Sequence, residues 1–297
     1  MPKLGFHVSL LKKSVSHSIS YFHKLCNISA FQLFLKSPKQ KGAINIKEDE
    51  YIKSKKYIED NDLFVVSHSP YIINIASSDE DTINSNIQYA VSEINAISKL
   101  GGKGSVYHVG KSVKLSKEDG FNYMCNFIKK VLDILIERQT TGYFILETGA
   151  GCGTELCTKI EDMGKMYHQL NPEQKEKIRF CIDTCHIFSA GYQIDTVEGS
   201  SAFIDLFEKS IGWDKVICIH LNDSKTKCGS CVDRHENFTK GFLTKESIDG
   251  VLHFLMHCKK CDIPLILETP VNDSDYGIID IITERNNEIK LIQKWLE

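Results

Sequence analysis

The chain has 297 residues, of which 42% are hydrophobic and 25% are charged. This composition is ordinary for a globular protein with an apolar core, and it excludes disordered and collagen-like chains. Because 36 Lys and Arg are set against 39 Asp and Glu, the net charge is -3, and any nucleic-acid binding must come from a local basic patch or from bound cations.

Eight short runs rich in β-branched and aromatic residues predict β-strands. Each has about five residues, the usual length of a strand. Several are apolar without alternation, as in the buried strands of parallel sheets. In chain order the runs cover residues 3–8, 30–35, 63–67, 105–109, 143–147, 178–183, 216–221 and 263–268.

Helical patterns lie between these runs. Apolar residues recur at helical spacing over 87–97, and the glycines at 101–102 end that helix. Ser116 and Asp119 resemble a capping box before a second helix, and a third amphipathic pattern covers 248–255 after Thr244.

The alternation of strands and helices predicts the fold. Eight strand–helix units in succession indicate an α/β protein with a (β/α)8 TIM barrel, built as a single domain over residues 1–297. An open, doubly wound sheet is the alternative. It is less favoured because no Gly-rich dinucleotide-binding motif follows the first predicted strand.

Six consecutive strands of the predicted barrel end in a residue that can bind a metal ion. The carboxyl ends of barrel strands meet at one face, so these side chains converge there. Crowded carboxylates and imidazoles repel one another and lose hydration unless cations lie among them. Imidazole with carboxylate suits zinc, manganese or iron, and the number of histidines favours zinc. The six strand-end residues are His68, His108, Glu147, Asp183, His220 and Glu268. Three more candidates bring the set to nine: His186 follows Asp183 by three residues, and Asp233 and His235 lie between the last two predicted strands.

Nine ligands are too many for one ion, so we expect two or three ions with a bridging carboxylate. The same residues stand in motifs that resemble the endonuclease IV family of apurinic/apyrimidinic (AP) endonucleases. The resemblance runs over nearly the whole chain. Its most specific motifs are HSPY at 68–71, LETGAG at 146–151, CIDTCH at 181–186, HLNDSK at 220–225, VDRH at 232–235 and PLILET at 264–269.

The resemblance implies three Zn²⁺ ions per chain, with Mn²⁺ able to replace them. It assigns His68 and His108 to one ion, with Glu147 bridging to a second. Asp183, His220 and Glu268 complete the second ion, and His186, Asp233 and His235 hold the third. Glu147 and Glu268 are the expected catalytic carboxylates.

The implied activity is hydrolysis of the phosphodiester 5′ to an abasic site, which leaves a 3′-hydroxyl, together with removal of 3′-blocking groups. The expected partner is double-stranded DNA with abasic sites or blocked 3′ ends, bound by a monomer. No nucleotide cofactor is expected, because the glycines at 149–153 lack the Lys and Ser/Thr of a phosphate-binding loop.

Five residues are expected to contact the DNA. By family position, Tyr71 enters the gap left by the missing base, and Lys39 replaces the penetrating Arg of the family. Lys has no planar fork of donors, so base-edge contacts there should differ. Lys36, Lys111 and Arg234 are the other expected contacts, Lys36 as part of the basic run 36–41.

Two other function classes remain open. A divalent-metal sugar isomerase or epimerase of a related barrel family needs at most two metals and has no use for the segment 233–235. A noncatalytic DNA-binding protein would hold a structural zinc ion on two CxxC pairs, Cys228 with Cys231 and Cys258 with Cys261. That interpretation leaves the strand-end ligands unexplained, and free thiols are the simpler expectation.

The 11 cysteines bear on the compartment. Their number is odd, and the N-terminal segment has no apolar run of the kind that a signal peptide needs. No run approaches the ~18 apolar residues of a membrane span. We therefore expect an intracellular, reducing compartment, cytoplasm or nucleus, with no secretion and no membrane association.

Overall fold

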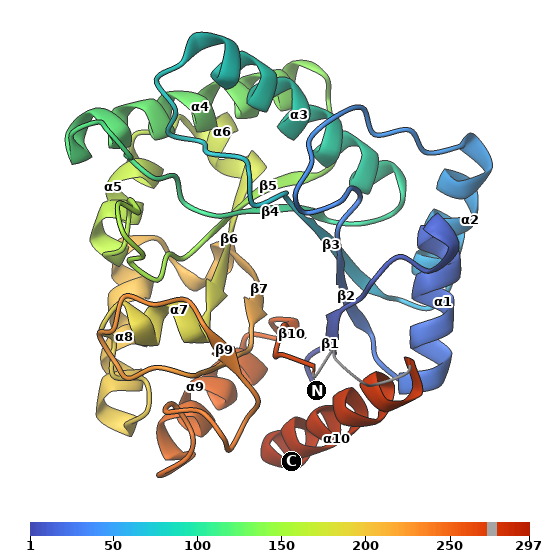
Figure 1. Ribbon diagram of the computed structural model, residues 1–297, viewed down its shortest axis with the longest axis vertical. Coiled ribbons are helices and arrows are strands. Elements are labelled where there is room, and N and C mark those ends of the chain that lie inside the picture. Colours follow the sequence, from blue (N-terminus) through green and yellow to red (C-terminus); the bar gives the residue numbers. More distant parts are fainter. Residues whose placement is uncertain (272–277) are drawn as a thin grey trace.

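The protein is a closed barrel of eight parallel strands surrounded by helices (Figure 1). The computed structural model describes residues 1–271 and 278–297. The barrel strands follow the order β1-β10-β7-β6-β5-β4-β3-β2, and β1 pairs with both β2 and β10 to close the ring. The strands are β1 (Leu4–His7), β2 (Ala30–Leu33), β3 (Phe64–His68), β4 (Gly104–Tyr107), β5 (Tyr143–Glu147), β6 (Ile178–Asp183), β7 (Val216–His220) and β10 (Leu265–Leu267).

The predicted barrel is confirmed, and each predicted strand run contains one barrel strand or most of it. The strands β5 and β6 match the predicted runs 143–147 and 178–183 at both ends. The strand β10 is shorter than its run, so Glu268 lies just beyond its end. A second, two-stranded ribbon pairs β8 (Asp223–Ser224) with β9 (His235–Glu236), and it lies over the carboxyl end of the barrel.

Helices cover the outside of the barrel. The predicted helix over 87–97 is α3, which ends at Lys99 before the two glycines. Ser116 caps α4, and its hydroxyl accepts the Asp119 N–H at 3.0 Å. The helices are α1 (Val15–Cys26), α2 (Glu48–Asp60), α3 (Glu80–Lys99), α4 (Lys117–Glu137), α5 (Ile160–His168), α6 (Pro172–Lys177), α7 (Thr184–Ser189), α8 (Val197–Ser210), α9 (Asp249–Lys260) and α10 (Ile278–Leu296).

The third predicted helix, over 248–255, is α9, which starts at Asp249. Thr244 lies before it and donates its hydroxyl to the buried carboxylate of Asp223. This bond ties the loop before α9 to the β8–β9 ribbon.

Two apolar layers form the core. The larger one lies between the strands and the helices, and the smaller one fills the barrel. The inner layer consists of Ala30, Phe64, Val66, Val106, Ile145, Cys181, Cys218 and Ile266. Since side chains along a strand alternate between two faces, the residue two positions after each of these points into the barrel as well. This alternation decides which side chains reach the candidate site.

Within the described ranges, none of the helices is both long and apolar enough to cross a membrane.

Candidate metal centre

The strand-end ligands stand directly above the inner apolar layer. His68 follows Val66 by two residues, and Glu147 follows Ile145 in the same way. The same step of two residues separates inner-layer residues from His108, Asp183, His220 and Glu268. Strand alternation therefore directs all six side chains to the barrel axis at its carboxyl end.

The nine predicted ligands make up three groups, and Glu147 belongs to two of them; Asp183 and His235 also lie together with Cys185. In each group the nitrogen and oxygen ligand atoms lie within 4.8 Å of one another. The groups are His68, His108 and Glu147; Glu147, Asp183, His220 and Glu268; and His186, Asp233 and His235. This is the division that the family resemblance implies.

Glu147 lies at the centre of the first two groups. Its Oε2 is 3.4 Å from His68 Nε2 and 3.6 Å from His108 Nε2. Its Oε1 is 2.7 Å from His220 Nδ1, which is also 3.2 Å from Glu268 Oε2. One carboxylate thus faces both groups, as a bridging ligand must.

Asp183 and Asp233 connect the second and third groups. Asp233 Oδ1 is 3.3 Å from both His186 Nε2 and His235 Nε2. His235 Nε2 is also 3.4 Å from Asp183 Oδ2. The third group is therefore continuous with the second, although its ligands come from α7 and from the segment that leads into β9.

Backbone carbonyls fix the orientation of two imidazoles. His68 Nδ1 donates to the Ser69 carbonyl at 2.8 Å, and His186 Nδ1 donates to the Thr148 carbonyl at 2.7 Å. Each bond places the ring proton on Nδ1 and directs the Nε2 lone pair at the carboxylates. Ligating histidines in proteins are commonly held in this way.

Three buried atoms of the cluster have no hydrogen-bond partner among the described residues. They are Glu147 Oε2, His186 Nε2 and His235 Nε2. Buried polar atoms normally find a partner, and these three point at other ligand atoms. A divalent cation bound by nitrogen and oxygen ligands would satisfy all three, so the donor set fits zinc.

The electrostatics of the cluster also favour cations. Burial opposes ionisation of Glu147, but His220 and His108 outweigh burial and hold the pKa of its carboxyl well below its usual value. Burial would lower the pKa of His220, yet Glu268 and Glu147 raise it to about 10. The carboxylates thus remain ionised and attract positive charge, and protons compete with metal for the imidazoles.

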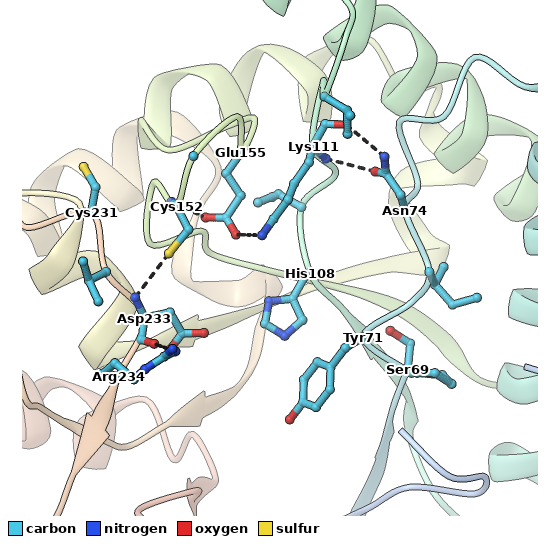
Figure 2. A pocket seen from close by; sticks show the side chains of 16 residues that line it. Ser69, Tyr71, Asn74, His108, Lys111, Cys152, Glu155, Cys231, Asp233 and Arg234 are labelled. Atoms are coloured by element: carbon cyan, nitrogen blue, oxygen red, sulfur yellow. Dashed lines mark hydrogen bonds and ion pairs between the residues drawn. The ribbon is translucent and has the colours of Figure 1, made fainter. Parts of the chain in front are cut away.

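A cavity of about 570 Å³ opens beside the first and third groups (Figure 2). Tyr71, Lys111 and Arg234 line it together with His108 and Asp233. Tyr71 is 64% exposed, and the centroid of its ring is 5.9 Å from that of His108. Three of the five predicted DNA contacts therefore lie around one opening to the ligand groups.

The other two predicted DNA contacts lie on the neighbouring loop. Lys36 lines a separate cavity of about 950 Å³ between the loops after β1 and β2. Lys39 is exposed on the same run, and the carbonyl of the adjacent Pro38 accepts the Tyr71 N–H at 3.0 Å. This bond holds the Lys-rich run and Tyr71 at the same face of the barrel.

Sequence reasoning missed two amides that contact the ligands. Asn222 donates to Asp183 Oδ2 at 2.7 Å. Gln32 donates to Glu268 Oε1 at 2.5 Å and contacts His220 Nε2 at 2.7 Å. The sequence pattern could have identified Gln32, because it follows the inner-layer Ala30 by two residues, as the strand-end ligands follow theirs. An amide is a poor metal ligand, so a search for ligands passed over it.

The two CxxC pairs do not assemble into a zinc site among the described residues. All four thiols are free: Cys258 is buried, Cys231 and Cys261 are exposed, and Cys228 is half-buried. None of the four belongs to a group of metal-binding side chains. The expectation of free thiols fits this arrangement, and the zinc ribbon does not.

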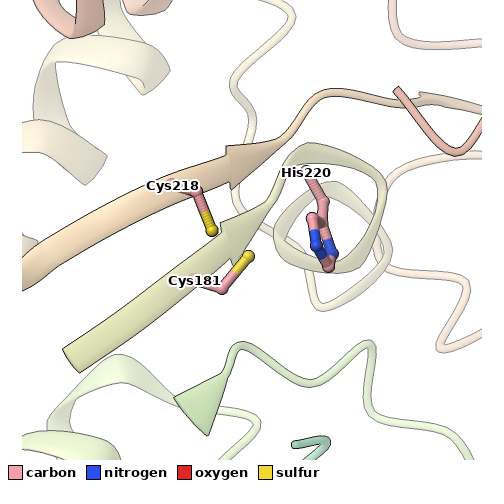
Figure 3. A group of neighbouring side chains, drawn as sticks. All are labelled: Cys181, Cys218 and His220. Carbon is pink, nitrogen blue, oxygen red and sulfur yellow. The ribbon is translucent and has the colours of Figure 1, made fainter. Parts of the chain in front are cut away.

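Cys181 and Cys218 lie side by side below His220 (Figure 3). Their sulfurs and the His220 ring form a further cluster of potential ligand atoms. However, burial raises the pKa of the Cys181 thiol well above its usual value, and both side chains belong to the inner apolar layer. They act as small apolar residues that support the ligands above them.

The chain resembles known proteins over its whole length. A family model described as xylose isomerase-like TIM barrel matches residues 24–297. The putative endonuclease 4 of Acanthamoeba polyphaga mimivirus is 31% identical over 298 residues, which cover 99% of this chain and 94% of that protein. The probable endonuclease 4 of Clostridium beijerinckii is 31% identical over 297 residues, which cover 99% of this chain and 98% of that protein.

The fold agrees with these sequence relatives. The crystal structure of endonuclease IV from Thermus thermophilus superposes with a TM-score of 0.80 at 24% identity and covers 99% of both chains. The family that the motifs predicted is therefore confirmed: the chain belongs to the endonuclease IV family of nucleases, within the xylose isomerase-like TIM barrels.

Proposed function

We propose that the protein is a zinc-dependent AP endonuclease that cuts the phosphodiester 5′ to an abasic site and leaves a 3′-hydroxyl. The observation that carries the proposal is the set of three contiguous ligand groups with Glu147 in two of them. Such a set would hold two ions close together and a third beside them. Phosphodiesters are cleaved by sites of this kind.

The metal cluster supplies positive charge for the phosphodiester and water of lowered pKa for its hydrolysis when the ions are bound. We assign the binding of these ions to the nine side chains named above, with Glu147 and Glu268 as the catalytic carboxylates. Bound cations make a Schiff base unnecessary, so the proposed chemistry is hydrolysis; elimination would instead require an amine at the reacting carbon.

Substrate selection follows from the residues around the opening. An abasic nucleotide has lost its stacking partner, so turning it out of the duplex costs less than for an intact nucleotide. The exposed ring of Tyr71 would fill the vacated space. Lys36, Lys39, Lys111 and Arg234 would contact phosphates on either side.

The third ligand group favours a nuclease over a sugar isomerase or epimerase. Those enzymes need at most two metals at the strand ends. His186, Asp233 and His235 converge within 4.8 Å and have no role in such a reaction. With an ion bound, the same group would supply a nuclease with additional positive charge for the departing 3′-oxygen.

The proposal includes some finer features. We expect three Zn²⁺ per chain, replaceable by Mn²⁺, and removal of 3′-blocking groups at the same site. We expect a monomer acting on double-stranded DNA in an intracellular, reducing compartment, where the 11 cysteines stay free.

The test is cleavage of a duplex with one tetrahydrofuran abasic analogue. This analogue lacks the aldehyde that elimination needs, so only hydrolysis cuts it. We expect a single cut 5′ to the analogue that is lost after chelation and restored by zinc. A protein that retains its full zinc complement and leaves the duplex intact would refute the proposed substrate.

A further inference from the structure

Gln32 occupies, on β2, the position that ligands occupy on the neighbouring strands. Six barrel strands direct a ligand to the axis two residues after an inner-layer residue. On β2 the inner-layer residue is Ala30, and the residue two positions later is Gln32, which is fully buried. A buried amide in a ring of imidazoles and carboxylates must bond to its neighbours, because leaving it unpaired costs ~1–3 kcal/mol.

The Gln32 amide bonds to two ligands of the four-residue group. Its Nε2 donates to Glu268 Oε1 at 2.5 Å, and its Oε1 lies 2.7 Å from His220 Nε2. The same Nε2 is 3.1 Å from His7 Nδ1. The amide oxygen and both amide hydrogens are therefore used.

These contacts fix which way the amide faces. In the opposite orientation, the amide oxygen would face the Glu268 carboxylate oxygen at hydrogen-bond distance, and two acceptors repel each other. The amide nitrogen must therefore face Glu268, and the amide oxygen must face His220. This assignment depends only on the hydrogen-bond partners, as it must for an amide.

The amide orientation in turn fixes the tautomer of His220. An amide oxygen only accepts hydrogen bonds, so the His220 Nε2 must carry a hydrogen and donate it. The lone pair of the neutral ring is then on Nδ1. That atom faces Glu147 at 2.7 Å and Glu268 at 3.2 Å, which is the metal-binding side.

We propose that Gln32 is a positioning residue for the metal ion of the four-residue group, and this inference rests on the proposed function. It holds His220 in the tautomer that presents Nδ1, and it holds Glu268 by Oε1 so that Oε2 faces Nδ1 of His220 at 3.2 Å on the ligand side. His220 lies on β7 and Glu268 follows β10. One side chain from β2 thus sets the geometry of ligands from two other strands.

His220 differs from the other two oriented imidazoles in the acceptor that it uses. The imidazoles of His68 and His186 donate to backbone carbonyls of adjacent loops. The Nε2 of His220 instead faces the side-chain oxygen of Gln32 on β2 at 2.7 Å.

The test compares Gln32→Met with Gln32→Glu. Methionine keeps the volume of glutamine and removes the hydrogen bonds to Glu268, His220 and His7. Glutamate keeps an acceptor for His220 Nε2 and removes the donor to Glu268. Ser67→Ala is the matched control, because the Ser67 hydroxyl is buried on the adjacent strand β3 and has no hydrogen-bond partner among the described residues.

Two properties are measured on full-length protein. The first is the number of zinc ions per chain and their affinity, by competition with a chromophoric chelator. The second is the protonation of each His220 nitrogen, from long-range ¹H–¹⁵N spectra. Thermal unfolding of each variant reports whether the fold is intact.

We expect Gln32→Met to weaken the binding of one zinc ion by about 10–100-fold, as is usual when such a supporting partner is lost. The His220 spectrum should lose its single Nε2–H form. Gln32→Glu should retain that form while still binding this ion more weakly, and Ser67→Ala should match the unmodified protein in both measurements.

The outcomes separate this inference from the proposed function. If the unmodified protein binds zinc with its full affinity and Gln32→Met does the same with an unchanged His220 spectrum, the positioning role is wrong. If the unmodified protein binds no zinc through His220, the proposed metal centre itself is wrong. A Gln32→Met protein that fails to fold leaves Gln32→Glu to decide, since loss of the Nε2–H form there also overturns the inference.

Discussion

Two buried carboxylates of this barrel have opposite surroundings. Glu93, on α3, accepts hydrogen bonds from the hydroxyls of Tyr107 at 2.7 Å, Ser105 at 3.0 Å and Tyr89 at 3.3 Å. Glu147, at the end of β5, lies among imidazoles, and its Oε2 has no hydrogen-bond partner among the described residues. Both side chains are almost completely buried.

The pKa of each carboxyl reflects this difference. Burial raises the pKa of Glu93 to about 7, because hydroxyl donors offset only part of the lost hydration. The pKa of Glu147 falls well below its usual value, despite burial, because His220 and His108 outweigh it. A complete hydrogen-bond shell indicates a structural acid, and an ionised acid with an unpaired oxygen indicates a ligand.

The largest effect is expected from Glu147→Gln. The change removes the charge that faces two ligand groups and replaces one ligand oxygen with an amide nitrogen. Incision at an abasic site should fall about 10³-fold or more, the order seen when transition-state charge stabilisation is lost. Steady-state cleavage and a zinc count per chain measure this, and the thermal transition should show that the fold persists.

Glu93→Gln is the matched control for that change. It is the same substitution in a carboxylate whose oxygens face hydroxyls and lie outside the ligand groups. We expect cleavage and zinc content close to those of the unmodified protein. Full activity in Glu147→Gln would show that Glu147 is not a bridging ligand and that its role does not differ from that of Glu93.

Glu93→Gln also has an effect of its own on stability. The folded pKa of about 7 lies above the unfolded value of 4.5, so the folded state binds the extra proton between these values. The contribution of Glu93 to the free energy of unfolding is fully present below pH ~4.5 and is lost as the pH rises through ~7, a total of about 3 kcal/mol. Glu93→Gln does not titrate, so the free energy of unfolding of the variant minus that of the unmodified protein should increase by that amount from low to high pH.

Urea unfolding of both proteins between about pH 5 and 8 measures the difference, with the other titrating groups in common. A constant difference across this range would show that Glu93 is ionised throughout, and its three hydroxyl partners would then be sufficient to stabilise the charge.

The contrast between the acids also shows what the sequence can predict. The convergence of six candidate ligands was predictable because strand alternation places each of them on the inner face, and imidazole and carboxylate are recognisable as potential metal ligands. Gln32 lies on the same inner face, but its amide is not a typical metal ligand, so the sequence did not identify it. Two partners of Glu93, Ser105 and Tyr107, follow it by 12 and 14 residues in the sequence. Only the packing of α3 on β4 brings them together.

The start of α9 shows a different limit. Thr244 is a good residue for a helix N-terminus, but its hydroxyl is used by the buried Asp223. Asp223 lies in the β8–β9 ribbon, whose two-residue strands carry no periodic signal. Local preference was therefore overridden by a tertiary contact that the sequence pattern does not contain.

Tyr71→Ala tests the opening to the ligand groups, which Tyr71 lines together with His108 and Asp233. The ring of Tyr71 touches Phe34, His68 and His108. Its loss should weaken binding to abasic DNA by about 1–3 kcal/mol, the usual contribution of aromatic stacking on nucleic acid, and should affect intact duplex less. Equilibrium binding to both duplexes measures this.

Tyr123→Ala is the control for that substitution, because Tyr123 is an exposed tyrosine on the outer helix α4. Its affinity for both duplexes should be unchanged. Equal losses of affinity for abasic and intact DNA in Tyr71→Ala would make the ring a general DNA contact that does not sense the missing base.

The smallest effect is expected from Lys111→Ala. Lys111 Nζ is 3.6 Å from the buried Glu155 Oε1, so a DNA phosphate must compete with a carboxylate for this ammonium group. The loss of one phosphate contact should lower the slope of log affinity against log salt by about 0.9. Abasic and intact duplexes should be affected alike, because a phosphate contact does not report on the base.

Glu155→Gln should have the opposite effect on DNA affinity to Lys111→Ala. The change removes the charge that competes with phosphate while keeping an oxygen for the Gly151 and Cys152 N–H groups, which Glu155 accepts at 2.9 and 3.0 Å. Lys111 is then free for DNA, so affinity should rise and the salt slope should steepen. Lys56→Ala, which removes a lysine paired with Asp60 on α2, should change neither. If Glu155→Gln and Lys111→Ala both weaken binding, the pair acts as a unit that holds the loops after β4 and β5, and Lys111 is not a phosphate contact.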